Sequence, residues 1–228
     1  MAIKFSRSHE TEMAHSYFIG MLLAFSGGFI DAYTYLTRDE VFAYAQTGNI
    51  VLMSINLGKT NYLRALLYLI PIITFILGVF TALWLRKKFS AHGRLWRQIV
   101  VLLESVIVMA VCFIPYGKYT NAAAIVLISL VSALQYEAFN RLRGQSFAST
   151  MCTGNLRSGS ESLYLYFETK DKTYRNKAIF YFGIISVFIL GAVIGTVLTH
   201  FLGFKAALFS VMFLLAAFIS LFFDKSII

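Results

Sequence analysis

Charged residues and prolines are scarce in this sequence. Only 14% of its 228 residues are charged, against roughly 25% in soluble domains, and 58% are hydrophobic. A soluble domain of this size needs a polar coat, and too few charges are present to build one. Two prolines and a mean hydropathy of +0.71 also exclude disordered and collagen-like chains. The composition therefore predicts an all-α integral membrane protein.

Residues suited to metal binding and catalysis are scarce too. Cys112 and Cys152 lack the spacing of a metal or redox pair, and the four histidines lie at predicted helix ends or in loops. No Walker, nucleophile-elbow or zinc-protease motif occurs, and no N-terminal signal peptide is predicted. We therefore expect no enzyme activity, no metal and no cofactor. The net charge is +9. In membrane proteins an excess of basic residues usually lies in the cytoplasmic loops, so we expect no nucleic-acid partner.

Six apolar stretches have about the 20 residues that cross a bilayer. They run roughly over 16–37, 65–85, 98–115, 122–140, 178–199 and 206–223. Within them the only charged residues are Asp31, Glu104 and Glu137. We predict one membrane domain over residues 1–228, with six transmembrane helices.

Two further apolar stretches, 41–58 and 144–167, have Thr-Gly-Asn near their middle, at residues 47–49 and 153–155. Gly and Asn are poor residues for a helix interior, and Thr is a usable N-cap. The helical run after each motif covers only about ten residues, too few to span the hydrocarbon. Both stretches are predicted to be broken or re-entrant segments.

The two halves of the chain repeat. A shift of 106 residues superposes the two Thr-Gly-Asn motifs and places Asp31 on Glu137, whereas a shift of 113 places 76–78 on 189–191. Repeat 1 covers about 16–115 and repeat 2 about 120–223. If the motif segments do not cross the membrane, the second copy is inverted, and 15 of the 20 basic residues share one side with both termini. The positive-inside rule favours this arrangement, with cytoplasmic termini, over parallel repeats.

Inverted repeats with interrupted helices are the usual architecture of channels and secondary transporters. A helix that starts at each motif would point its partly positive N-terminus inward, which favours an anion or a carbonyl-bearing solute. In this hypothesis the threonines cap, the glycines permit close approach and the asparagines offer amides. The predicted substrate-binding residues are Gln46, Thr47, Gly48, Asn49, Gln135, Thr153, Gly154 and Asn155. The alternative is that each motif only packs a re-entrant hairpin against its twin.

Asp31 and Glu137 form the second predicted site. An ionised carboxylate in the hydrocarbon costs at least about 2.5 kcal/mol, so it needs a partner, a proton or a wet cavity. We predict that both acids couple proton or ion movement to transport. The alternative is a structural ion pair, or a hydrogen bond to the unwound Thr-Gly-Asn backbone. Glu104 has no equivalent in the other half, so its case is weaker. The candidate ion-pair partners, one or two helical turns from the acids, are Arg38, Arg141 and Arg143.

Two long motifs resemble a known family. GGFIDAYTYL at 27–36 leads into QTGNIVLMSINLG at 46–58, and LQYEAFNRLRGQSFASTMCTGNL occupies 134–156. These resemble the YoaK family of bacterial membrane proteins, over nearly the whole chain. The resemblance implies a six-span protein of the bacterial inner membrane, but no activity. The second half has Ala133-Leu134 where the first has Gly27-Gly28, which argues against strict equivalence of the halves. The resemblance implies that the signature positions of the family are Gly27, Gly28, Asp31, Thr47, Gly48, Asn49, Gln135, Arg141, Thr153, Gly154 and Asn155.

The leading functional hypothesis is a small secondary transporter or channel for a small polar solute, anions included, with proton coupling. The runner-up is a non-transporting scaffold, sensor or assembly factor whose basic loops, 86–97 and 170–177, bind anionic lipid headgroups. A membrane enzyme acting on lipid comes third. The expected partners are the lipid bilayer and a small-molecule solute, and a homo-oligomer stays open.

Overall fold

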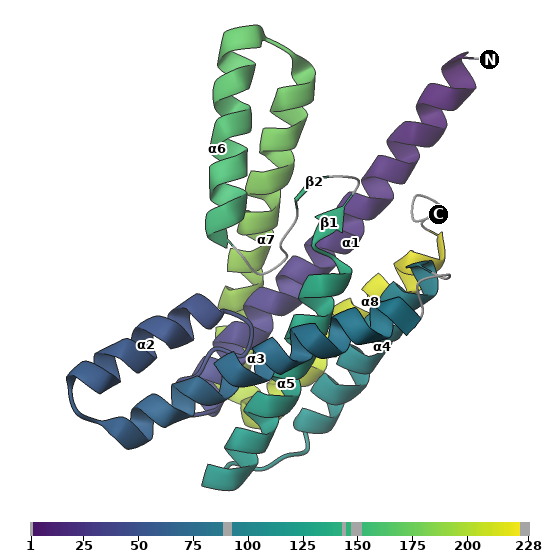
Figure 1. Cartoon of the computed structure of the whole chain (residues 1–228). Helices are drawn as coiled ribbons and strands as arrows, with labels where there is room; N and C mark the ends of the chain where they lie inside the picture. The colour runs from purple at the N-terminus through teal and green to yellow at the C-terminus, as the bar shows by residue number, and fades with distance from the viewer. Residues whose placement is uncertain (1, 89–92, 143–144, 147–151, 224–228) are drawn as a thin grey trace.

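The computed structural model describes residues 2–88, 93–142, 145–146 and 152–223, with backbone only for 2–16, 93–94, 141–142 and 145–146. This part of the chain is almost wholly helical (Figure 1), which confirms the all-α class. Two short strands, β1 (Arg141–Leu142) and β2 (Gln145–Ser146), pair antiparallel. The helices are α1 (Ala2–Thr37), α2 (Gln46–Gly58), α3 (Tyr62–Lys88), α4 (Gly93–Val111), α5 (Lys118–Ala138), α6 (Cys152–Thr169), α7 (Lys172–Leu202), η1 (Gly203–Ala206) and α8 (Ala207–Phe223).

Each of the six predicted apolar stretches lies on its own helix: α1, α3, α4, α5, α7 and α8. Four helical runs of the described chain are long and apolar enough to cross a membrane. They are Tyr17–Thr37, Tyr62–Lys88, Lys118–Ala138 and Lys172–Phe223. The last run has 52 residues, enough for two crossings of about 20 residues, and it contains α7 and α8 with the turn η1 between them. Helix α4 carries Arg94, Arg97 and Glu104 and is not among the four.

Large apolar side chains point outward on α3, α7 and α8. Leu63 on α3 is 82% exposed and Phe201 on α7 is 75% exposed, and Phe80, Met212 and Phe223 are also largely exposed. Soluble proteins rarely leave so wide an apolar surface open to water. This surface therefore faces lipid.

The core forms where long helices cross. Helix α1 packs on α7 and α8, and α5 packs on α3 and α4, while α2 lies along α3 and α6 along α7. If α1, α2, α3 and α4 are exchanged with α5, α6, α7 and α8, in that order, the same set of packed pairs results. In Figure 1 the α2–α3 hairpin leaves the body to the left and the α6–α7 hairpin leaves it at the top. The two halves of the chain thus follow the same packing plan.

The crossing of α1 and α7 is so close that it requires glycine. A Cβ atom added to Gly28 would lie 2.1 Å from the carbonyl oxygen of Phe188. One added to Gly191 would lie 2.2 Å from the carbonyl oxygen of Phe25. Both obstacles are backbone atoms, so neither can rotate away. Small residues at a helix interface are how backbones approach one another in membranes.

Both Thr-Gly-Asn segments begin a separate helix that ends at a tight turn. Helix α2 has 13 residues, whereas α6 has 18, longer than the predicted run of about ten, since it continues along α7 to Thr169. Thr60 and Lys170 follow the two helices with φ of 56°, the left-handed conformation that reverses the chain. Asp171 then caps α7 by accepting from the Thr173 N–H at 2.8 Å, and this bond holds the pKa of Asp171 below its usual value.

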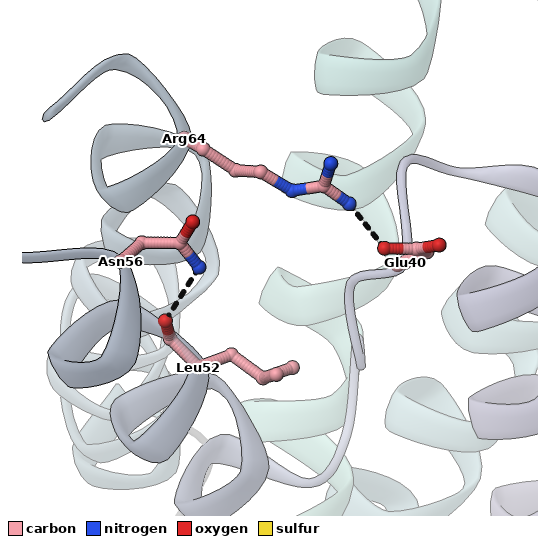
Figure 2. A network of polar contacts seen from close by, with 4 residues as sticks. All are labelled: Glu40, Leu52, Asn56 and Arg64. Carbon is pink, nitrogen blue, oxygen red and sulfur yellow. Dashed lines mark hydrogen bonds and ion pairs between the residues drawn. The ribbon is translucent and has the colours of Figure 1, made fainter. Parts of the chain in front are cut away.

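Figure 2 shows two polar contacts made by residues of the α2–α3 hairpin. Arg64 at the start of α3 forms an ion pair with Glu40, in the link before α2. The Asn56 side chain donates to the carbonyl of Leu52 at 2.8 Å, within α2. Both members of the ion pair are about half exposed, so the pair contributes little stability and mainly orients the hairpin.

We expect Gly191→Ala to lower the melting temperature of the protein in detergent, and Gly183→Ala to leave it unchanged or raise it. Both residues lie on α7, but a Cβ at residue 183 would meet only the Met21 methyl carbon, at 3.7 Å. Alanine gains about 1 kcal/mol over glycine in a helix, whereas overpacking costs about 1–3 kcal/mol. Equal melting temperatures for the two variants would contradict the tight α1–α7 crossing.

Candidate functional site

The link between α1 and α2 leaves helical geometry inside the protein, so its backbone needs internal partners. Four consecutive N–H groups, those of residues 42–45, donate to side chains. The acceptors are Asn49 Oδ1 for Phe42 (3.0 Å), Thr34 Oγ1 for Ala43 (3.2 Å), and Asp31 Oδ1 for Tyr44 (2.9 Å) and Ala45 (3.2 Å). A single oxygen of Asp31 therefore holds two N–H groups directly before α2.

The carbonyl groups of the link are satisfied as well. Phe42 accepts from the Asn49 amide at 2.6 Å, and Ala43 accepts from the Gln46 amide at 3.1 Å and from Ser132 Oγ at 3.2 Å. Gln46 also accepts from Asn49, at 3.0 Å. The amide of Asn49, which was predicted to meet a ligand or partner helix, instead clamps the protein's own link.

The predicted caps are wrong in their detail. Helix α2 begins at Gln46, its N-cap is Ala45, and no side chain caps it. Thr47 lies inside the first turn and is exposed, while Asp31 and Asn49 accept from N–H groups that precede the helix. Helix α6 begins at Cys152, so Thr153 also lies inside its helix.

The first turns of α2 and α6 meet at a cavity of about 440 Å³, called the central cavity below. Thr47 and Thr153, equivalent under the 106-residue shift, both line it, and so do Phe75 and Phe188, equivalent under the 113-residue shift. The remaining lining residues are Tyr44, Ala45, Gln46, Tyr136 and Cys152. None of these described lining residues has a carboxylate or a basic group. The cavity thus combines two partly positive helix ends, hydroxyls, an amide and aromatic rings.

A second cavity, of about 350 Å³, lies between α1, α7 and the link. Asp31 lines it, and Ala45 and Phe188 line both cavities. Asp31 is almost fully buried, and its Oδ2 has no hydrogen-bond partner among the described residues. One oxygen of this acid is therefore structural, while the other is uncommitted.

Glu104 belongs to the same buried region, although sequence reasoning gave it less weight. It is fully buried on α4, and the Tyr44 hydroxyl donates a hydrogen bond to its Oε1. Its Oε2 has no partner within the described chain. Tyr44 therefore connects Asp31, Glu104 and the central cavity. The sequence signal was present, since Glu104 is an acid in the middle of an apolar helix.

A family model described as "Protein of unknown function (DUF1275)" matches residues 19–220. The chain belongs to the DUF1275 family. It is similar to the UPF0700 transmembrane protein YoaK of Bacillus subtilis (strain 168), at 30% identity over 180 residues, which cover 76% of this chain and 79% of the relative. No solved structure matches it. The predicted YoaK family is therefore confirmed, and with it the membrane setting.

Glu137 of this DUF1275 protein has a different environment from Asp31. Its Oε1 accepts from Arg86 at the end of α3, at 3.0 Å, and its side chain is 13% exposed. An ion pair was the alternative given for this acid, and the partner that the described residues give it is Arg86. Arg143 and the side chain of Arg141 lie outside the described residues.

Arg38 is fully buried and binds backbone carbonyls rather than an acid. Its guanidinium donates to the carbonyls of Val111 (3.3 Å), Ile114 (2.8 Å) and Pro115 (3.3 Å). Val111 is the last residue of α4, where the helix dipole is negative, and Ile114 and Pro115 follow in the connection to α5. Asn121 Oδ1 and the Tyr33 hydroxyl accept the remaining bonds, at 3.0 and 3.1 Å. Arg38 therefore fastens the end of α4 to the link.

The other predicted binding residues do not line the central cavity. Gln135 is 1% exposed, and neither atom of its amide has a partner among the described residues. Asn155 is buried. A Cβ on Gly48 would lie 2.7 Å from the Phe42 ring, so glycine at this position leaves room for Phe42 of the link. A Cβ on Gly154 would meet nothing within 4 Å. Within the described ranges, no group of three His, Cys, Asp or Glu residues could hold a metal ion.

We expect Asp31→Ala to destabilise the protein and Asp31→Asn to leave it close to wild type. Alanine leaves the N–H groups of Tyr44 and Ala45 without an acceptor, at about 1–3 kcal/mol for each buried group, whereas asparagine keeps one oxygen. Melting temperature and folded yield in detergent measure the effect, with the exposed acid Glu161→Ala as control. An Asp31→Ala variant as stable as wild type would contradict the role of Asp31 in the link.

Proposed function

We propose that this DUF1275 protein is a small secondary transporter or channel of the bacterial cytoplasmic membrane. A small polar solute passes through the cavity between α2 and α6. The observation that carries the proposal is that two equivalent helix N-termini, from the two halves of the chain, border one cavity. Sites at the interface of repeated halves, built from interrupted helices, are typical of transporters.

The proposed membrane arrangement has six spans, α1, α3, α4, α5, α7 and α8, with α2 and α6 as short helices that do not cross. The helix pairs that pack together are the same in both halves of the chain, which supports two related units of three spans each. Inversion of the second unit, with both termini cytoplasmic, rests on the basic residues of the loops.

The proposed solute is a small anion or a neutral molecule with a carbonyl group. The cavity volume of about 440 Å³ lies in the lower part of the roughly 300–1,000 Å³ range of ligand sites. Thr47, Thr153 and Gln46 offer hydrogen bonds, and the helix ends favour negative charge. Asp31 is the coupling acid in this proposal. Glu137, paired with Arg86, is given a structural part.

The native Cys152 reports whether the cavity is wet. In sealed vesicles we expect it to react with a membrane-impermeant anionic methanethiosulfonate, while Cys112, which is fully buried, does not. Thr47→Trp fills the opposite wall and should slow the reaction several-fold. The exposed Thr81→Trp on α3 should not. Formate, chloride and urea serve as competitors, and protection identifies the class of solute. A Cys152 that reacts from neither side would indicate a sealed interior and favour the scaffold alternative.

Sidedness tests the inverted arrangement. With Cys112 and Cys152 replaced by serine, single cysteines at Thr60 and Lys172 mark the turns that follow α2 and α6, and both positions are exposed. We expect an impermeant maleimide added to intact cells to label residue 60 alone. Labelling of both positions from outside would show parallel repeats.

A further inference from the structure

Glu104 is a buried acid whose charge nothing in the described chain offsets. Its helix, α4, packs on α5 and α8. Helix α8 has no charged residue, and the charges of α5, Lys118 and Glu137, lie at its ends. The only partner that the described residues give Glu104 is the hydroxyl of Tyr44. A carboxylate buried without a cation is strongly disfavoured, so the neutral acid is the form that fits this place.

Tyr44 is the residue that lies between this acid and the cavity. Its N–H is held by Asp31 at 2.9 Å, its hydroxyl binds Glu104, and the residue lines the central cavity. Among the described residues, the titratable groups linked to Glu104 by hydrogen bonds are Tyr44 and, through Tyr44, Asp31. Cys152 borders the cavity from the other half. Two acids joined by one residue in an apolar region disfavour the state in which both are ionised.

We propose that Glu104 is a proton-binding site and that the Tyr44 hydroxyl relays its proton to the central cavity; this rests on the proposed transport function. The relay starts from the reverse of the hydrogen bond between Tyr44 and Glu104: neutral Glu104 carries its proton on Oε1 and donates to Tyr44 Oη, while the Tyr44 O–H turns toward the cavity. The O–H bond of Glu104 then breaks as a new O–H bond forms on Tyr44 Oη. The original Tyr44 proton passes to an anionic solute in the cavity. Glu104 is left ionised and the solute neutral, and the reverse transfer restores both. The solute class is thus a weak-acid anion that travels with a proton.

A second pair of the same residue types supplies the control. The Tyr164 hydroxyl donates to Glu168 at 2.6 Å on α6, where both side chains are exposed. Hydrogen bonding to Glu168 raises the pKa of Tyr164, but water solvates the carboxylate there. Glu168→Gln therefore controls for the effect of replacing any tyrosine-bound glutamate by its amide.

Infrared spectra of the full chain in lipid vesicles, recorded across pH, test the site directly. We expect a carboxylic-acid carbonyl band at neutral pH that is lost in Glu104→Gln and kept in Glu168→Gln. Tyr44→Phe should shift the band, because it removes the hydrogen bond to Glu104. If Glu104→Gln fails to fold, this shift is the result that assigns the band to Glu104. A band that persists in Glu104→Gln, or that disappears only in Asp31→Asn, would overturn the inference.

Flux separates this inference from the transport proposal. In proteoliposomes with an internal pH dye and a formate gradient, wild type should move protons with formate, Glu168→Gln should match it, and Glu104→Gln should lose the proton movement. Wild-type vesicles that move neither formate nor protons overturn transport of this solute, whereas a Glu104-dependent band in the same preparation still supports the proton site. Proton movement unchanged in Glu104→Gln overturns the inference and leaves the transport proposal intact.

Discussion

Everything at the centre of this protein depends on one constraint: the buried, non-helical backbone of residues 42–45 must find its hydrogen bonds inside the protein. Asp31, Thr34 and Asn49 provide the acceptors for its four N–H groups. Because these side chains come from α1 and α2, they fix where one helix ends and the next begins. That choice places the first turn of α2, with Thr47, on the cavity. Ser132 binds the same link from the other half, so the break also joins the two repeats.

The helices and the meeting of the motifs were predictable, because both follow from local sequence. Apolar length fixes the helices, and identical spacing in two copies indicates that residues 47 and 153 play matching parts. The direction of Asn49 and the position of the N-cap were not predictable. They depend on Asp31, which is far from the motif in sequence and adjacent to it in space. A capping threonine is the local preference, but the helix begins at Gln46, directly after the two N–H groups that Asp31 binds.

The halves agree in packing but differ in chemistry. Gly78 and Gly191 occupy equivalent close crossings, against Ala133 and Phe25 respectively. The equivalent acids do not behave alike. Asp31 is held by the link, whereas Glu137, one methylene longer, pairs with Arg86 at the basic end of α3. In both halves a small residue allows the two helices to approach closely. Glu104, which binds the cavity residue Tyr44, has no counterpart in the other half at all.

Asp31 and Glu104 show why structure and function overlap in this site. Asp31 uses one oxygen for the link and leaves the other uncommitted; Glu104 does the same with Tyr44. Removing either side chain would disturb the fold, so only the amide replacements, which keep an oxygen acceptor and abolish the ionisable carboxyl group, isolate the chemistry. Arg38 adds a further dependence, since it ties the end of α4 to the link and so keeps the helix that carries Glu104 in place. A buried cation that binds carbonyls thus positions a buried acid that has no cation of its own.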